Sequence, residues 1–266
     1  AWGYNFFPLY VRYYQTLGKD YMGMTARFHK SWADFGGLKN KAALEYECFQ
    51  MLASGARCSI GDQLHPRGKL DKAAYDEIKD VYKSVAEKEP WIQNVKPLVE
   101  IAILNPANPQ AIASRATKST EGAMRILLES HYQFHIIDEK ADFRKYRLLI
   151  LPDDVRLDKT LAAKLKTYLK KGRVLLNYLS GLAQDKDEFM LQEMGIGYIG
   201  KDTCSPNYIH LESPLLKKDI PPLEYVCYEG GAEIKVLGNA EILARIGHPY
   251  FNRTWDHFSS HFQAPL

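Results

Sequence analysis

Apolar and polar positions alternate between two kinds of segment along the first ninety residues of the chain. Apolar runs at 22–28 and 56–61 predict buried strands, because each is too short for a helix and ends at hydrogen-bonding side chains. Helical spacing of apolar residues predicts a helix at 5–17 and further helices that begin after Asn40 and Asp71. Repeated strand–helix units indicate parallel strands, so this region is predicted to be of the α/β class.

Residues 90–97 interrupt this alternation and predict a linker. The pattern then returns, with predicted strands at 99–104, 134–137, 147–151 and 173–177 and predicted helices at 120–131 and 158–172. From about residue 205 it changes to Pro-rich loops and short strands, including a hairpin predicted through Gly230 and Gly231. The second region is therefore predicted to be a separate, flavodoxin-like α/β domain.

Composition narrows the class of protein. The chain has 266 residues, of which 46% are apolar and 25% charged, and its net charge of +3 comes from interspersed signs. These values are typical of a globular protein and do not indicate nucleic-acid binding. No apolar stretch reaches the ~18–20 residues that span a bilayer, so no membrane partner is expected. The four cysteines lack CxxC spacing, which predicts free thiols and a reducing, cytoplasmic location. The beginning at Ala1 has no signal-peptide pattern and is expected to lie within a longer protein.

Polar and aromatic side chains follow both early strands, at the points where the strands end. The carboxyl ends of parallel strands are where α/β proteins build their binding sites. An ion pair that fixes a loop is an alternative role for an Asp beside an Arg, and a Trp there can equally cap the core. The candidate binding residues are Arg27, His29, Trp32, Asp62, Gln63 and His65.

The segments TARFHKSWADFGGLK and ALEYECFQMLASGARCSIGDQLHPRGKLD resemble the closing segments of a (β/α)8 TIM barrel in a group of glycoside hydrolases. These are related to alpha-L-fucosidases and, more distantly, to family 42 beta-galactosidases. Residues from about 97 resemble the beta-galactosidase trimerisation domain, which has a class I glutamine-amidotransferase-like fold; PYFNRTWDHFSSH (249–261) is similar to a motif near its end. The resemblance implies two domains: the C-terminal portion of the barrel at 1–92 and a truncated trimerisation domain at 97–266.

The resemblance implies hydrolysis of a terminal sugar from an oligosaccharide, with fucosidase ahead of galactosidase, a retaining mechanism and no cofactor. Such chemistry uses two carboxylic acids. The first strand end offers none, and the second offers Asp62 as a candidate catalytic acid. In the resembled barrels the main carboxylates come from earlier strands, so this chain alone is expected to be inactive. Arg27 and His29 are expected to bind sugar hydroxyls and Trp32 to stack on a ring face. For Glu45 and Glu47, within a predicted helix, solvent exposure or a local salt bridge is expected.

Two further patterns in the sequence bear on chemistry. A nucleophile elbow after the strand at 173–177 would place Leu179 where a catalytic thiol belongs, with Ser180 beside it, which argues against an independent hydrolase or amidotransferase. His257 and His261 have helical spacing but no third ligand, so no metal site is expected. An interface that assembles a homotrimer is expected instead, through Tyr250, Phe251, Arg253, Trp255 and His257. A non-catalytic carbohydrate-binding or assembly module remains the alternative function.

Overall fold

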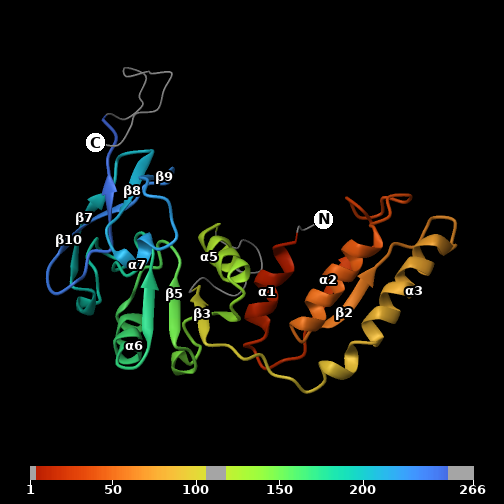
Figure 1. Ribbon diagram of the computed structural model, residues 1–266. Helices are drawn as coiled ribbons and strands as arrows, with labels where there is room; N and C mark the ends of the chain where they lie inside the picture. The colour runs from red at the N-terminus through yellow and green to blue at the C-terminus, as the bar shows by residue number, and fades with distance from the viewer. Residues whose placement is uncertain (1–3, 106–117, 251–266) are drawn as a thin grey trace. The chain divides into compact units, whose positions relative to one another are not determined.

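The computed structural model describes residues 4–105 and 118–250. These residues form two compact units, which are described separately below. The first unit comprises Ala1–Pro152 with Tyr168–Leu175, and the second comprises Asp153–Thr167 with Leu176–Leu266. Figure 1 shows the helices and strands along the chain and labels those for which there is room.

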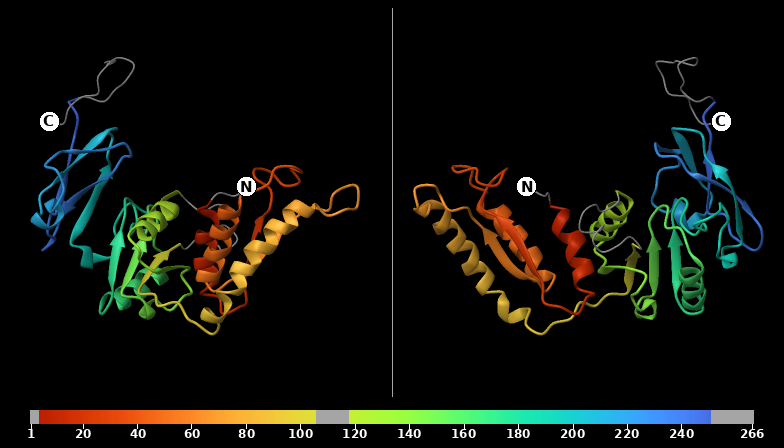
Figure 2. Two further views of the ribbon diagram at one scale, coloured as in Figure 1. Left: turned by 45° about the vertical axis from the view of Figure 1, so that its right-hand side comes forward. Right: turned by 180° about the vertical axis from the view of Figure 1, so that it is seen from behind.

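The first unit begins with two strand–helix repeats. Strands β1 and β2 pair in parallel, as the repeated pattern predicts, and helices α2 and α3 lie beside them (Figures 1 and 2). Both predicted helix caps are confirmed, because the side chains of Asn40 and Asp71 accept hydrogen bonds from backbone N–H groups of the first turns. The elements are α1 Phe6–Tyr14, β1 Met22–Ala26, α2 Lys41–Ala53, β2 Arg57–Gly61, α3 Lys72–Ala86 and the short η1 Glu89–Trp91.

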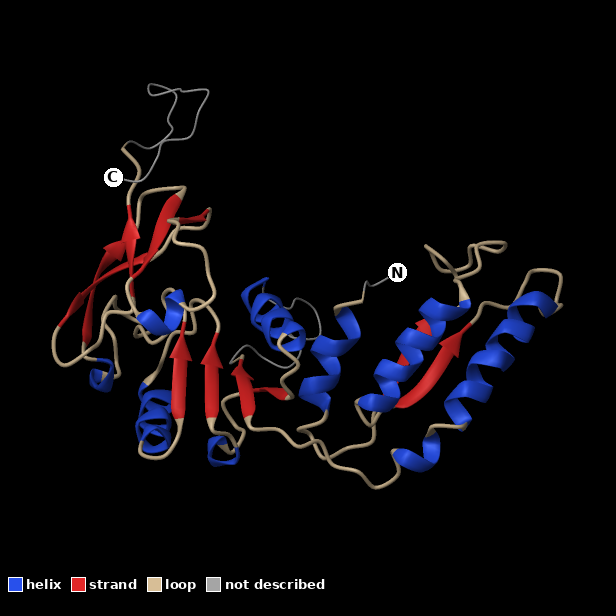
Figure 3. Cartoon of the chain, viewed as in Figure 1, coloured by secondary structure: helices blue, strands red, loops and turns tan. Residues whose placement is uncertain are grey.

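A four-stranded sheet follows in the same unit, in the order β4-β3-β5-β6 (Figure 3). β3 pairs in parallel with both β4 and β5. Helix α1 packs on this sheet together with α5, through a core that includes Tyr13, Ile103, Met124 and Phe134. The elements are β3 Ile101–Leu104, α5 Lys118–Glu129, β4 Phe134–Ile137, η2 Phe143–Lys145, β5 Leu148–Leu151, α6 Lys159–Leu169 and β6 Arg173–Leu176, the last two of which extend into the second unit.

The rest of the second unit consists mainly of antiparallel strands, drawn in teal and blue in Figure 2. The prediction of a hairpin through Gly230 and Gly231 is wrong. β9 and β10 do flank these glycines, but β9 pairs with β8 and β10 pairs with β7, so they enter different sheets. The elements are η3 Gln192–Met194, β7 Ile196–Lys201, β8 Asn207–Leu211, α7 Pro214–Lys217, β9 Tyr225–Cys227, β10 Ala232–Val236 and β11 Ala244–Gly247.

Within residues 4–105 and 118–250, no helix combines the length and apolar character that crossing a membrane requires.

Acid is expected to destabilise the first unit through His135 on β4. Burial, assisted by the positive charges of Arg12 and Lys145, lowers the pKa of His135 to about 4. The folded unit therefore favours the neutral ring, and the associated stability is lost as pH falls from about 6.5 towards 4. Allowing for partial exposure, the loss is about 2 kcal/mol. Urea unfolding at several pH values should show this fall in the natural chain and a smaller one in His135→Gln. An exposed histidine provides the control, because His131→Asn should keep the full fall.

Candidate functional site

The strand pair β1–β2 has one face covered by helices and one that is not. Cys58 and Ile60 of β2 join the core formed with α2 and α3. On β1, a side chain at Gly23 would collide with Met51 and Phe7, because an added Cβ would lie 2.6 Å from atoms of each. Side chains alternate along a strand. The opposite face therefore carries the three register pairs Met22 with Arg57, Met24 with Ser59, and Ala26 with Gly61.

Arg27 and Asp62 follow the carboxyl ends of these two strands and form a buried ion pair. The Arg27 Nε atom lies 2.8 Å from Asp62 Oδ1, and the two side chains are 1% and 12% exposed. Arg27 Nη1 also lies 3.8 Å from Asp71 Oδ2 at the start of α3. Asp62 additionally accepts a hydrogen bond from the backbone N–H of Gln63. The pair thus joins the loop after β1 to the loop after β2.

Aromatic rings surround this ion pair. The Arg27 guanidinium carbon lies 4.3 Å from the Phe28 ring centre and 5.7 Å from that of Phe35. Phe28 contacts Trp32 edge-on, with the ring centres 5.4 Å apart, and Phe35 contacts His65 at 4.7 Å. Cationic stacking of this kind is stabilising when the cation is desolvated.

Trp32 lies across the strand ends on the face away from the helices. Its Nε1–H donates to Gln63 Oε1 at 2.9 Å. Its six-membered ring covers Gly61, where an added Cβ would come within 2.9 Å of two ring carbons. Gly61 therefore provides the space in which the indole sits. The indole nevertheless remains half exposed, at 50%, so one ring surface is free to contact a ligand.

Five of the six predicted binding residues are thus linked by contacts, and His29 is not. The His29 side chain is exposed, and its backbone N–H donates to the Gly37 carbonyl at 2.9 Å. Among the contacts between described residues, none joins its imidazole to the Arg27–Asp62 pair. The structure therefore places His29 beside the cluster and keeps its side chain in solvent.

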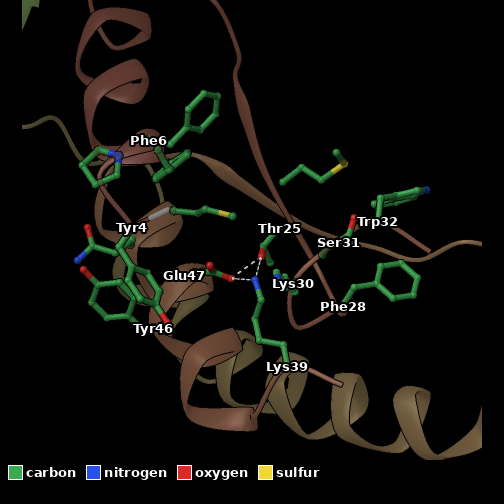
Figure 4. A pocket seen from close by; sticks show the side chains of 16 residues that line it. Tyr4, Phe6, Thr25, Phe28, Lys30, Ser31, Trp32, Lys39, Tyr46 and Glu47 are labelled. Carbon is green, nitrogen blue, oxygen red and sulfur yellow. Dashed lines mark hydrogen bonds and ion pairs between the residues drawn. The ribbon is translucent and has the colours of Figure 1, made fainter. Parts of the chain in front are cut away.

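A pocket of about 280 Å³ adjoins Trp32 and runs along β1 towards α1 and α2 (Figure 4). Lys39, Glu47 and Thr25 meet at its polar centre. Lys39 Nζ lies 2.7 Å from Glu47 Oε2 and 3.0 Å from Thr25 Oγ1, and the Thr25 hydroxyl donates to the same Glu47 oxygen. The Lys39 and Glu47 side chains are only 10% and 23% exposed. Rings of Tyr4 and Tyr46 pack edge-on at one end of this pocket, 5.2 Å apart.

No sequence pattern predicts that this polar centre belongs to a site. Glu47 was expected to be solvent-exposed or to make a local salt bridge, and the structure shows a partly buried salt bridge to Lys39, which precedes the helix. Helical spacing gives one indication that Glu47 is partly buried. Glu47 lies three residues after Leu44 and four before Met51, so it shares a helix face with these two buried side chains. No pattern identified Lys39, which lies at the end of the loop that precedes α2.

The turn after β6 in the second unit lacks an accessible nucleophile. Leu179 occupies the position where an elbow would hold a thiol, and it is 2% exposed. Ser180 is also buried, and its Oγ accepts a hydrogen bond from the Val155 N–H at 3.0 Å. Tyr178, rather than either of these, takes the left-handed backbone conformation, with φ of 51°. The Ser180 hydroxyl is thus engaged in holding the backbone.

Most of the predicted interface lies beyond the part of the chain that the structure describes. Tyr250 is described and is 65% exposed. Phe251, Arg253, Trp255 and His257 lie outside the described residues, as does His261.

Comparison with known proteins confirms the resemblance stated from the sequence. Residues 101–201 match the family model of the beta-galactosidase trimerisation domain. Among solved structures, alpha-L-fucosidase isoenzyme 2 from Paenibacillus thiaminolyticus is similar over 99% of this chain, with 38% sequence identity and a TM-score of 0.90. The matched region is 40% of that protein's chain. No curated protein sequence gives a significant match.

Beta-galactosidases share the fold at lower identity. The enzyme from Rahnella sp. R3 covers 94% of this chain with 15% identity and a TM-score of 0.73. The enzyme from Bacillus circulans sp. alkalophilus covers 95% with 17% identity and a TM-score of 0.71. This chain spans 42% of each of them. The chain therefore has a mixed α/β, glycoside-hydrolase-related fold and corresponds to less than half the length of these relatives.

Proposed function

We propose that this chain is part of a glycoside hydrolase that removes a terminal sugar from oligosaccharides, with alpha-L-fucose ahead of beta-galactose as the sugar. The fold similarity to alpha-L-fucosidase, at 38% identity across 99% of the chain, supports this order. The chain contributes one wall of the sugar pocket and an oligomerisation domain. The observation that carries the pocket assignment is the half-exposed Trp32 indole, held by Gln63 over Gly61.

The strand geometry supports residues 1–92 as the last two units of a (β/α)8 barrel. In such barrels helices cover the outside, strand side chains fill the inside, and binding sites lie at the carboxyl ends. Here α2 and α3 cover one face, and Trp32 and the Arg27–Asp62 pair lie at the carboxyl ends. Met22 and Met24 on the other face are 64% and 63% exposed, which is costly for apolar side chains and is relieved by further barrel strands.

The side chains of this wall are proposed to contact the sugar in different ways. Trp32 offers a flat apolar surface for one face of a sugar ring, and Gln63, His29 and His65 offer hydrogen bonds to its hydroxyls. Asp62 already neutralises Arg27, so we assign it to hydroxyl binding and loop anchoring ahead of proton transfer. The two carboxylic acids that the reaction uses are proposed to lie on preceding barrel strands.

Residues 97–266 are proposed to assemble the protein into a homotrimer. The match of residues 101–201 to a trimerisation domain supports this role. The strand order β4-β3-β5-β6 is 2-1-3-4 in chain order, which supports a flavodoxin-like and amidotransferase-like classification. The exposed Tyr250 begins the segment proposed as the interface, with Phe251, Arg253, Trp255 and His257. Light scattering of the purified chain tests the proposal, and a strictly monomeric chain contradicts it.

Activity assays separate the enzyme from a binding module. 4-Nitrophenyl alpha-L-fucoside and beta-D-galactoside would be assayed with this chain and with a version extended upstream. Release of nitrophenol by the extended protein alone is the expected result. Turnover by the present chain would contradict our placement of the catalytic acids. Sugar binding without turnover by either version would instead favour the non-catalytic module.

Trp32→Ala in the extended enzyme is expected to lower kcat/KM by about tenfold to a hundredfold, because about 1.4–2.7 kcal/mol of ring contact is lost. The measurement is initial rate against substrate concentration. Trp91→Ala is the matched control, since Trp91 in η1 is 82% exposed and outside the pocket. Equal kinetics for both variants and the natural enzyme would remove Trp32 from the site.

A further inference from the structure

Three potential metal ligands of different chemistry meet in the second unit, whereas the residues of the proposed sugar pocket belong to the first. They are the carboxylate of Asp202, the thiol of Cys204 and the imidazole of His248. One donor atom from each lies within 4.8 Å of the donor atoms of the other two. His248 Nε2 lies 3.4 Å from Asp202 Oδ1.

Strand ends far apart in sequence bring these ligands together. Asp202 directly follows β7, and His248 directly follows β11. The loop between β7 and β8 is folded around the carboxylate. Asp202 Oδ1 accepts a hydrogen bond from the Cys204 backbone N–H at 2.8 Å, and Oδ2 accepts one from Asn207 Nδ2 at 2.6 Å. Hydrogen bonds of this kind orient ligating carboxylates in metal sites.

The charge of Asp202 points to a cation at this position. Its side chain is only 3% exposed, and a buried carboxylate is costly unless it is paired or coordinates a metal. Among the described residues, His248 is the only ionisable base within 4 Å of it. Asn207 lies beside this carboxylate and donates to it. This residue is 1% exposed, and its Oδ1 is buried without a hydrogen-bond partner among the described residues. That oxygen is in the same amide group that contacts the carboxylate.

The separation between the Asp202 and His248 donor atoms fits a tetrahedral zinc ion. With Zn–O and Zn–N bonds of about 2.0–2.1 Å, a tetrahedral centre places ligand oxygen and nitrogen about 3.3 Å apart. The observed 3.4 Å between Asp202 and His248 agrees with this value. The His248 side chain is 45% exposed, so the cluster has a solvent-facing side through which an ion can enter.

We propose that Asp202, Cys204 and His248 bind a zinc ion. The thiol of Cys204 loses its proton on binding and ligates as a thiolate. A water molecule takes the fourth position, on the side of the exposed imidazole. The metal ties the loop after β7 to the end of β11, and so stabilises the fold of the second unit independently of sugar hydrolysis.

Titration of the metal-free full chain with zinc tests the site. Competition against a chromophoric chelator should show one tight zinc ion per chain, and zinc should raise the midpoint of thermal unfolding. Cobalt in place of zinc should give a thiolate-to-metal absorption band. Absence of stoichiometric zinc binding overturns the proposal.

Variants place the metal at these ligands. His248→Ala removes a half-exposed side chain and should fold, and Cys204→Ser should abolish the thiolate band; each should weaken zinc binding at least tenfold. Cys227→Ser is the matched control, because this thiol lies outside the cluster. Loss of zinc from a variant of His257 and His261, with retention by His248→Ala, would locate the metal elsewhere and overturn the assignment.

Discussion

Replacing Arg27 with alanine is expected to lower the free energy of unfolding of the first unit by about 3 kcal/mol. The guanidinium is 1% exposed and pairs with Asp62 at 2.8 Å. Its removal leaves a carboxylate that is only 12% exposed without its nearest cation, and breaking a buried pair in this way costs about 3–5 kcal/mol. We take the lower value because Asp62 retains some solvent contact. Stacking on Phe28 is lost as well. Urea unfolding with linear extrapolation measures the change.

Arg57→Ala is the matched control for this prediction. Arg57 pairs with Asp20 at 3.2 Å, but both side chains are largely exposed, at 76% and 89%. Exposed pairs contribute about 0–1 kcal/mol, so this variant should remain close to the natural chain. The double variant Arg27→Ala/Asp62→Asn should recover part of the loss, since no buried charge remains unpaired. Equal stability of the Arg27 and Arg57 variants would show that the buried pair is not an anchor.

Local signals explain why most elements were predictable. Short apolar runs predict strands at 22–28 and 56–61, and the structure places β1 and β2 within them. The Asn40 and Asp71 caps are predictable because a single side chain accepts hydrogen bonds from the first turn of its own helix. The wrong prediction of a hairpin shows that local sequence does not determine which strands pair. Gly230 and Gly231 mark a turn, but which strand pairs with β9 or β10 is decided by the whole sheet.

In the site, too, some contacts are predictable from the sequence and others depend on the path of a loop. Contact between Arg27 and Asp62 followed from parallel strands whose carboxyl ends meet at one edge, and the structure has this contact. Trp32 and Gln63 were both candidate binding residues, but the hydrogen bond between them was not predicted. The Lys39–Glu47 pair could not be foreseen, because it depends on the path of the loop between β1 and α2. The role of these side chains in sugar binding stays a prediction.

Replacing Phe134 with alanine is expected to destabilise the first unit by about 3–5 kcal/mol, the usual cost of deleting a buried aromatic ring. Phe134 is 1% exposed at the start of β4, in the core where α1 and α5 meet the sheet. The Arg12 guanidinium of α1 lies 4.5 Å from its ring centre, so the loss includes a contact between α1 and the sheet. Urea unfolding and hydrogen exchange of α1 would measure this.

Tyr132→Ala provides the matched control for Phe134, two residues earlier and 58% exposed. This change should alter stability by no more than about 0.5 kcal/mol, as surface substitutions do. If α1 is held to the sheet through Phe134, its amides should exchange faster in Phe134→Ala at low denaturant, where the unit is still folded. If the unit loses stability while hydrogen exchange in α1 is unchanged, the Phe134 ring stabilises the sheet and does not hold α1 to it. Helix α1 belongs to residues 1–92 but packs on the sheet of residues 97–266. Unchanged exchange in α1 would therefore also indicate that residues 1–92 stay folded when the sheet of residues 97–266 is destabilised.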